Sequence, residues 1–192
     1  MAKVNEMPTR GLFALPPRSA VHTFYAARRV EQLMAVIGMR EMVEQVLGVL
    51  SEAFEGPHGT WSYFTDSGRD AGLFGTLEGL DAEVASRVLG RTSIAAHVNH
   101  VTFGLHASAR WIEGDRTTHK LDESWSVSSV DREEWTRARE RLRTAYRDMR
   151  RAVEIFAMES EESMAGAVGA LAHVAYHLGA IRQKVSFVAA GG

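Results

Sequence analysis

The sequence predicts an all-α fold: an antiparallel four-helix bundle with a long crossover connection and an irregular N-terminal arm. Four long segments carry apolar residues at intervals of three and four, which is the spacing of one face of an α-helix. No stretch alternates apolar and polar residues over enough positions to make a sheet of any size. Amphipathic helices joined by loops bury their apolar faces against one another in a bundle.

The chain of 192 residues is long enough for one domain with a substantial core. Residues 1–18 contain three of the four prolines, Pro8, Pro16 and Pro17, and are expected to form the irregular arm. The helical bundle domain is expected to occupy residues 19–192. The apolar run from Leu12 to Leu15 is too short for a secretory signal.

The first long helix is predicted from Ser19 to Phe54. Gly38 is expected to mark a kink or a break in it, and Gly56-Pro57 ends it. A loop with aromatic residues follows, and a short helix is predicted over about residues 70–88. The apolar positions of the first helix are Val30, Leu33, Met34, Ile37, Val43, Val46, Leu47, Leu50 and Phe54.

The second half of the chain contains the other three long helices. One is predicted from Ser93 to about Glu113, and an irregular crossover with short extended pieces follows over residues 116–131. Asp131 is the expected N-cap of a helix that runs to about Met158, and the last helix covers about Glu161–Val188. The apolar stripe of the 93–113 helix is Ile94, Val98, Val101, Leu105, Ala109 and Ile112.

Composition argues against several classes of function. A net charge of −2 gives no strong attraction to nucleic acid or membrane, and the Arg-rich face of residues 137–151 is interleaved with acids as in a solvated helix. Residues 163–181 carry no charge and are long enough to raise the question of a membrane span. Because they are mostly Ala and Gly with two histidines, a central bundle helix and a cytoplasmic protein are expected instead.

Two histidines interrupt this uncharged stretch. His173 and His177 are four residues apart, so they lie about 40° apart around the helix axis and stack on one face. Gly166, Gly169 and Ala180 lie near the same edge and leave room for an ion or a ligand. Either the two imidazoles bind one metal ion, or they are core histidines that hydrogen-bond to the backbone.

A second histidine cluster lies on the 93–113 helix. His97 and His100 are about 60° apart, whereas His106 is about 180° from His97 and cannot share a site with it. One of the first two could supply a third ligand from a facing helix, or both could simply pack in the core. The chain has no cysteine, so only His, Asp, Glu or water can hold a metal. Three neutral imidazoles with open positions form a catalytic type of site for zinc, nickel or iron.

Several stretches together resemble the DinB-like (YfiT-like) superfamily of metal-binding four-helix bundles. The last-helix motif, Ala172-His-Val-Ala-Tyr-His-Leu-Gly-Ala-Ile-Arg-Gln183, is fairly specific, and the combination spans most of residues 30–188. The other segments that carry the resemblance are Glu52-Ala-Phe-Glu-Gly56 with Trp61, Thr92-Ser-Ile-Ala-Ala-His-Val-Asn-His100, Arg110-Trp-Ile-Glu-Gly114, Glu123-Ser-Trp125 and Val130-Asp-Arg-Glu-Glu-Trp135.

The resemblance implies a ligand set, because members of this family place one histidine on the second helix and two on the last. By position these are His100, His173 and His177. His97 falls where the family is usually apolar, so it is expected to pack beside the ligands or to hydrogen-bond to them. Ala180 replaces a common Gln, which affects a contact to the ligands or substrate rather than the ligands themselves. Further candidates are Asn99 and Tyr176 as hydrogen-bond partners of the ligands, and Arg182 and Gln183 as substrate contacts.

Characterised members of the family include S-transferases and an isomerase that use a low-molecular-weight thiol. The resemblance therefore implies a metal-dependent enzyme with a divalent metal, a small thiol cofactor and a small-molecule substrate. One alternative is a hydrolase that uses a metal-activated water, although no Asp or Glu is placed convincingly as its general base. Another is a non-enzymatic metal-binding protein of a stress response. A homodimer is expected, and the sequence singles out no catalytic residue beyond the ligands.

Overall fold

The protein is all-α in the computed structural model, which describes residues 18–64, 68 and 71–191. Within these residues there is no strand, and only an isolated bridge joins Leu89 to Thr92. The predicted arm lies outside the described residues except for Arg18, where the first helix begins. The elements are α1 (Arg18–Glu55), α2 (Leu73–Leu77), α3 (Ala82–Ser86), α4 (Ile94–Ile112), the 3-10 helix η1 (Leu121–Trp125), α5 (Arg132–Phe156) and α6 (Glu161–Ala189).

The residues divide into two compact units, Met1–Gly38 and Met39–Gly192. The division falls inside α1, which nevertheless continues unbroken through Gly38, so of the predicted kink or break at this residue the break is wrong. In the first unit the helix forms as predicted, but its apolar side chains are exposed rather than packed. The exposed fractions are 60% for Val30, 55% for Leu33, 64% for Met34 and 46% for Ile37.

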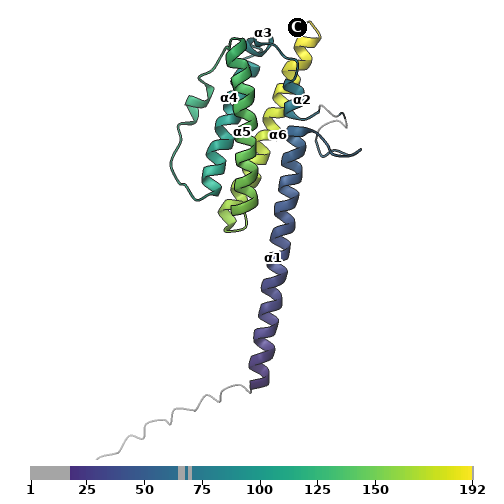
Figure 1. Ribbon diagram of the computed structural model, residues 1–192, viewed down its shortest axis with the longest axis vertical. Coiled ribbons are helices and arrows are strands. Elements are labelled where there is room, and N and C mark those ends of the chain that lie inside the picture. The colour runs from purple at the N-terminus through teal and green to yellow at the C-terminus, as the bar shows by residue number, and fades with distance from the viewer. Residues whose placement is uncertain (1–17, 65–67, 69–70, 192) are drawn as a thin grey trace, which may run out of the picture. The chain divides into compact units, whose positions relative to one another are not determined.

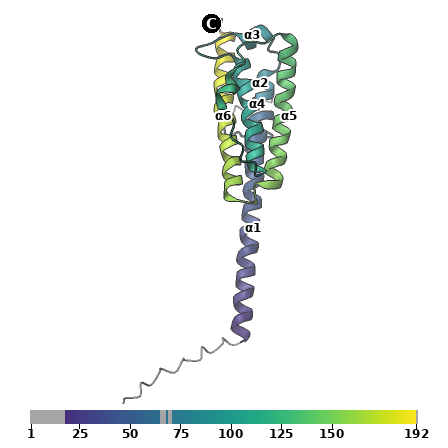
Figure 2. The same ribbon diagram turned by 90° about the vertical axis from the view of Figure 1, so that its left-hand side faces the viewer.

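The second unit contains a single hydrophobic core. α4 packs against both α5 and α6, and the three helices run side by side (Figures 1 and 2). The C-terminal part of α1 contributes Val43, Val46, Leu50 and Phe54 to the same core. The predicted stripe of α4 is buried along its whole length, from Ile94 to Ile112. Burial of such a stripe is the main source of helix stability in a folded protein.

Local capping sets where the long helices begin. The Ser93 hydroxyl accepts a hydrogen bond from the Ala96 amide and donates one to the Ser128 carbonyl, which ties the crossover to the start of α4. Asp131 is the N-cap of α5, as predicted, and forms a reciprocal capping box with Glu134. Because each cap satisfies amides that the helix leaves unpaired, the sequence alone locates these ends closely.

Two connections differ from the prediction. The helix expected over about residues 70–88 is in fact two short helices, α2 and α3. Gly79 has a φ of +79° between them, which no right-handed helix can continue, and the Asp81 side chain caps the second helix. The crossover contains η1, a 3-10 turn that the pattern did not indicate.

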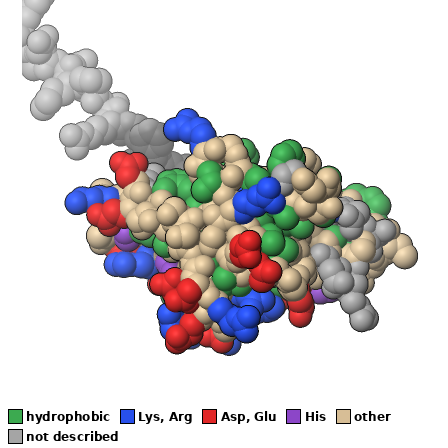
Figure 3. Space-filling view, turned by 90° about the horizontal axis from the view of Figure 1, so that it is seen from above, with side chains coloured by type: hydrophobic (Ala, Val, Ile, Leu, Met, Phe, Trp, Pro, Cys, Tyr) green, Lys and Arg blue, Asp and Glu red, His purple; other side chains and the backbone are tan. Residues whose placement is uncertain are grey.

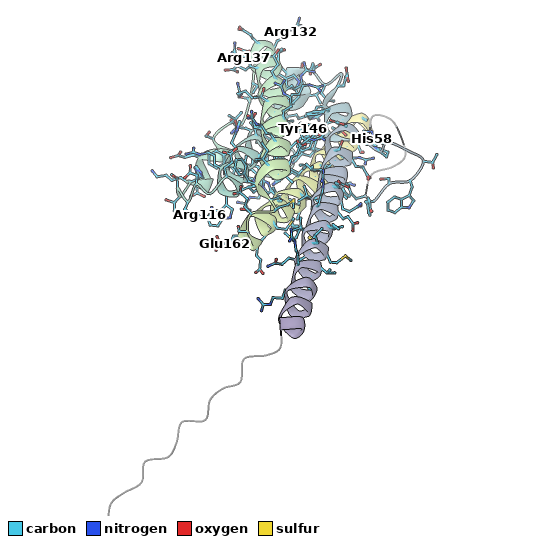
Figure 4. All side chains as sticks on the ribbon, turned by 60° about the horizontal axis from the view of Figure 1, so that its bottom comes forward. His58, Arg116, Arg132, Arg137, Tyr146 and Glu162 are labelled. Atoms are coloured by element: carbon cyan, nitrogen blue, oxygen red, sulfur yellow. The ribbon has the colours of Figure 1, made fainter. Side chains whose placement is uncertain are left out.

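Side-chain bonds link α5 to the end of α1 and the crossover to the start of α6. The Tyr146 hydroxyl of α5 donates to the Glu55 carboxylate at the end of α1, at 2.8 Å. Arg116 at the start of the crossover forms an ion pair of 2.9 Å with Glu162 at the start of α6. Figure 4 labels Tyr146, Arg116 and Glu162 where these elements meet. An exposed pair such as Arg116–Glu162 contributes little stability, at most about 1 kcal/mol.

Helix α6, which contains the uncharged residues 163–181, is long and apolar enough to cross a membrane by length and composition. It contributes Ala170, Val174, Leu178 and Ile181 to the core, however, as the central helix of a soluble protein does. Seen from above, basic and acidic side chains are interspersed on the same face (Figure 3). The structure is therefore compatible with a soluble protein, and this face shows no extended patch of one charge.

Candidate metal centre

Helices α4 and α6 bring the three predicted ligands together. One nitrogen from each of His100, His173 and His177 lies within 4.8 Å of the other two. The Nε2 atom of His173 is 2.9 Å from that of His100 and 3.1 Å from that of His177. His106, which the helix geometry placed on the opposite face, is exposed and outside this group. The three histidines are therefore close enough to hold one metal ion.

The spacing along each helix explains this convergence. His173 and His177 are one turn apart on α6, and His100 faces them from α4. Gly104, one turn after His100, leaves the space that the His173 ring occupies. A Cβ atom at Gly104 would lie 2.7 Å from Cε1 and 3.0 Å from Nδ1 of His173. The absence of a side chain at residue 104 thus lets α6 present His173 to His100.

The crossover supplies the partner of His100. The Nδ1 atom of His100 lies 2.6 Å from the hydroxyl of Ser124, a buried residue of the crossover. The next residue, Trp125, stacks on the His100 ring with a centroid distance of 4.0 Å and an interplanar angle of 18°. Because η1 carries both residues, it fixes the orientation of the His100 ring. Ser124 belongs to the Glu123-Ser-Trp125 motif, but no pattern in the sequence indicates its contact with His100.

A fourth histidine, His97, contacts the Nδ1 side of the His177 ring. His97 is 6% exposed, and its Nδ1 atom is 2.9 Å from Nδ1 of His177. Its Nε2 atom is 2.9 Å from the Thr92 hydroxyl. The expectation that His97 would pack beside or hydrogen-bond to the ligands thus agrees with its position.

The other predicted contacts are less direct. The side-chain amide of Asn99 donates to the Ser124 carbonyl at 2.8 Å, so it holds η1 rather than a ligand ring. Tyr176 is 72% exposed, and its ring meets the edge of His177 at a centroid distance of 5.0 Å. Both residues lie beside the centre, but the hydrogen bonds to ligand nitrogens come from Ser124 and His97.

Burial favours the uncharged form of these histidines. It lowers the pKa of His177 from its ordinary 6.5 to about 3 and that of His97 to about 4, with further lowering by neighbouring histidines and, for His97, by Lys184. Burial also lowers the pKa of His100 and of His173. Neutral imidazole is the form that binds a metal, because its second nitrogen keeps a lone pair.

The spacing of the nitrogens fits a small divalent ion. Zinc–nitrogen bonds of about 2.0–2.1 Å in a tetrahedral site keep the nitrogens about 3.3 Å apart. The Nε2 distances of 2.9 and 3.1 Å are close to this value. Three histidines without a thiolate suit zinc, nickel or iron, and leave room for a further ligand.

A cavity of about 720 Å³ opens beside the centre. His177, His97 and Thr92 line it together with Trp125 and two cationic residues, Arg91 and Lys184. The predicted substrate contact Gln183 lines it, whereas Arg182 is not among its lining residues. No Asp or Glu is found among the described residues of the lining. Its size is that of a site for a small organic molecule.

Comparison of the chain with models of protein families, with curated proteins and with solved structures gave no match in any of the three.

Proposed function

We propose that this protein is a metal-dependent enzyme of the DinB-like class of antiparallel four-helix bundles, and that it transfers a low-molecular-weight thiol to an electrophilic substrate. The observation that carries the proposal is the convergence of His100, His173 and His177 within 4.8 Å. Two helices supply these ligands, in the positions that the resemblance implies. Burial lowers the pKa of His177 and of His173, which favours the neutral imidazole that a metal needs, and this supports the proposal.

A divalent ion held by the three histidines would lower the pKa of a bound thiol and stabilise its thiolate near neutral pH. The thiolate sulfur would form a bond to an electrophilic carbon, whose leaving group would depart with the bonding electron pair, and the thiol proton would go to solvent. The chain has no cysteine of its own, so the sulfur must come from a small molecule. The residues of the protein bind and orient the reactants.

The cavity is the proposed site of this small molecule, and its lining favours a negative charge. Arg91 and Lys184 line it and no carboxylate does so among the described residues. Within the part of the chain that the structure describes, the lining offers no carboxylate that could serve as the general base of the alternative hydrolase, which favours thiol transfer over that alternative. The apolar residues Val88, Val127 and Trp125 complete the wall and would contact the uncharged part of the ligand.

Metal content tests the first part of the proposal. Purified protein is expected to carry nearly one equivalent of zinc, nickel or iron. His100→Ala, His173→Ala and His177→Ala should each lose most of it, whereas His106→Ala, on the exposed side of α4, should retain it. Native protein that takes up no added metal would refute the proposal, and equal loss in all four variants would refute the assignment of the ligands.

Thiol binding tests the second part. Cobalt-substituted protein is titrated with anionic 3-mercaptopropionate and with neutral 2-mercaptoethanol, and the sulfur-to-cobalt charge-transfer absorption is followed. The anionic thiol should bind more tightly. Arg91→Gln should reduce this preference, whereas Arg87→Gln, outside the cavity lining, should preserve it. No charge-transfer band with either thiol would exclude thiol activation at this centre.

A further inference from the structure

Two hydrogen bonds link His177 through His97 to Thr92. His177 Nδ1 lies 2.9 Å from His97 Nδ1, and His97 Nε2 lies 2.9 Å from the Thr92 hydroxyl. A neutral imidazole has one N–H donor and one acceptor nitrogen. The contact between the two Nδ1 atoms therefore needs a proton on one of them, and the choice determines the tautomers of both rings.

Only one choice allows His177 to bind a metal through Nε2. In that state His177 carries its proton on Nδ1 and donates it to His97, and His97 donates from Nε2 to the Thr92 oxygen. In the reverse state His97 donates to His177, the proton of His177 lies on Nε2, and that nitrogen has no lone pair for a metal. Hydrogen bonds to the distal nitrogen commonly orient metal-bound histidines in this way.

We propose that His97 is a positioning residue for the metal centre: it accepts the Nδ1 proton of His177 and thereby keeps Nε2 of His177 available as a ligand. Thr92 supports it by accepting from His97 in turn. Burial strengthens the argument, because His177 is 3% exposed and His97 6% exposed, and buried polar atoms need hydrogen-bond partners. This inference rests on the proposed metal site but not on thiol chemistry.

The position of His97 distinguishes this role from packing. An apolar side chain at residue 97 would fill the same space without accepting a proton. In this chain His97 contacts Trp125 edge-on at a centroid distance of 5.3 Å and also meets the His177 ring. Packing alone explains the contact with Trp125. It does not explain two nitrogens that are each 2.9 Å from a polar partner.

The test compares two substitutions whose side chains have the same number of heavy atoms and the same branch at Cγ. In His97→Asn, the side-chain oxygen stands close to the former Nδ1 position and can accept the proton of His177. In His97→Leu, the shape is similar but no acceptor remains. Zinc affinity is measured by competition with a chromophoric chelator, and the ligand-field absorption of the cobalt form reports the coordination geometry. Urea unfolding of the metal-free variants checks that each is folded.

His97→Leu is expected to lower zinc affinity about 10- to 100-fold, the usual effect of losing such a partner. It should also change the cobalt spectrum. His97→Asn should stay within about threefold of native, and Thr92→Val should show a smaller loss than His97→Leu because it acts one bond further away. Equal zinc affinity in the Leu variant and native protein, or equal losses in the Leu and Asn variants, would overturn the inference. If native protein bound no metal, the metal site itself would be wrong.

Discussion

Gly104 offers a sharp test of how the metal centre is built. A Cβ atom there would lie 2.7 Å from Cε1 and 3.0 Å from Nδ1 of His173. Carbon atoms in contact are normally about 3.5–4.0 Å apart, so Gly104→Ala requires the imidazole to move by about 1 Å. A functional constellation tolerates errors of only about 0.5 Å. We therefore expect the variant to lose zinc affinity by about tenfold or more.

Gly104→Ala should also change stability differently from a Gly→Ala substitution at a helix position where the added Cβ meets open space. Replacing Gly by Ala inside a helix normally stabilises it by about 0.5–1 kcal/mol. Gly179 on α6 has no atom within 4 Å of the corresponding Cβ position. Gly179→Ala should thus raise the free energy of unfolding of the metal-free protein and leave zinc affinity unchanged. At Gly104 the collision should cancel the gain or reverse it.

Both variants are measured in the same two assays: urea unfolding of the metal-free protein and zinc competition with a chelator. The informative result is the pair, because a general effect of Gly→Ala would appear in both variants. If Gly104→Ala bound zinc as tightly as the native protein, His173 would not be a ligand, or its ring would not lie against α4 as described. Either explanation would refute the proposed geometry of the three histidines.

Three further predictions concern the surroundings of the site. Ser124→Ala removes the hydroxyl 2.6 Å from His100 Nδ1 and should weaken zinc binding by about 1 kcal/mol, close to fivefold, in the same competition assay. Asp131→Ala removes the N-cap of α5 and should lower the free energy of unfolding by about 1 kcal/mol without changing zinc affinity, a difference that urea titration resolves. In the metal-free protein the pKa of His97 is lowered from 6.5 to about 4 and that of His177 to about 3, so the unfolded chain binds more protons below pH 6.5. These two histidines should therefore leave the free energy of unfolding unchanged above pH 6.5 and should lower it as the pH drops towards 4. Urea titrations over this pH range measure the effect. A free energy that does not change with pH would contradict the burial of the two rings.

The sequence predicts the long helices well because their signals are local. Ser93 and Asp131 cap α4 and α5 through amides three residues away, so the ends of these helices need no tertiary information. Local signals alone could not predict that His100 lies close to His173 and His177. Helical periodicity predicted the face of its own helix on which each histidine lies, and the family resemblance selected these three as a set. The all-α class and the closeness of these three histidines are both confirmed.

What sequence reasoning missed depends on contacts between distant segments. Ser124 is 24 residues from His100, and only the fold of the crossover brings them together. The same is true of Gly104 and His173, since nothing local to Gly104 shows which ring will lie against it. The exposed apolar residues around Leu33 show another limit of sequence reasoning. An apolar stripe predicts which face of a helix is hydrophobic, but not whether another part of the protein covers that face.

Lys184 ties α6 to the segment just before α4, and so fixes how the candidate metal ligands on these two helices face each other. Its ammonium group donates to the Leu89 carbonyl at 2.6 Å and to the Thr92 carbonyl at 2.9 Å, two turns after His177 on α6. A shift of α6 by one residue, about 1.5 Å, would break both bonds. The register between the two ligand helices is therefore set by the protein itself. Little ordering entropy remains to be lost on coordination, so metal uptake is expected to be fast and its affinity high.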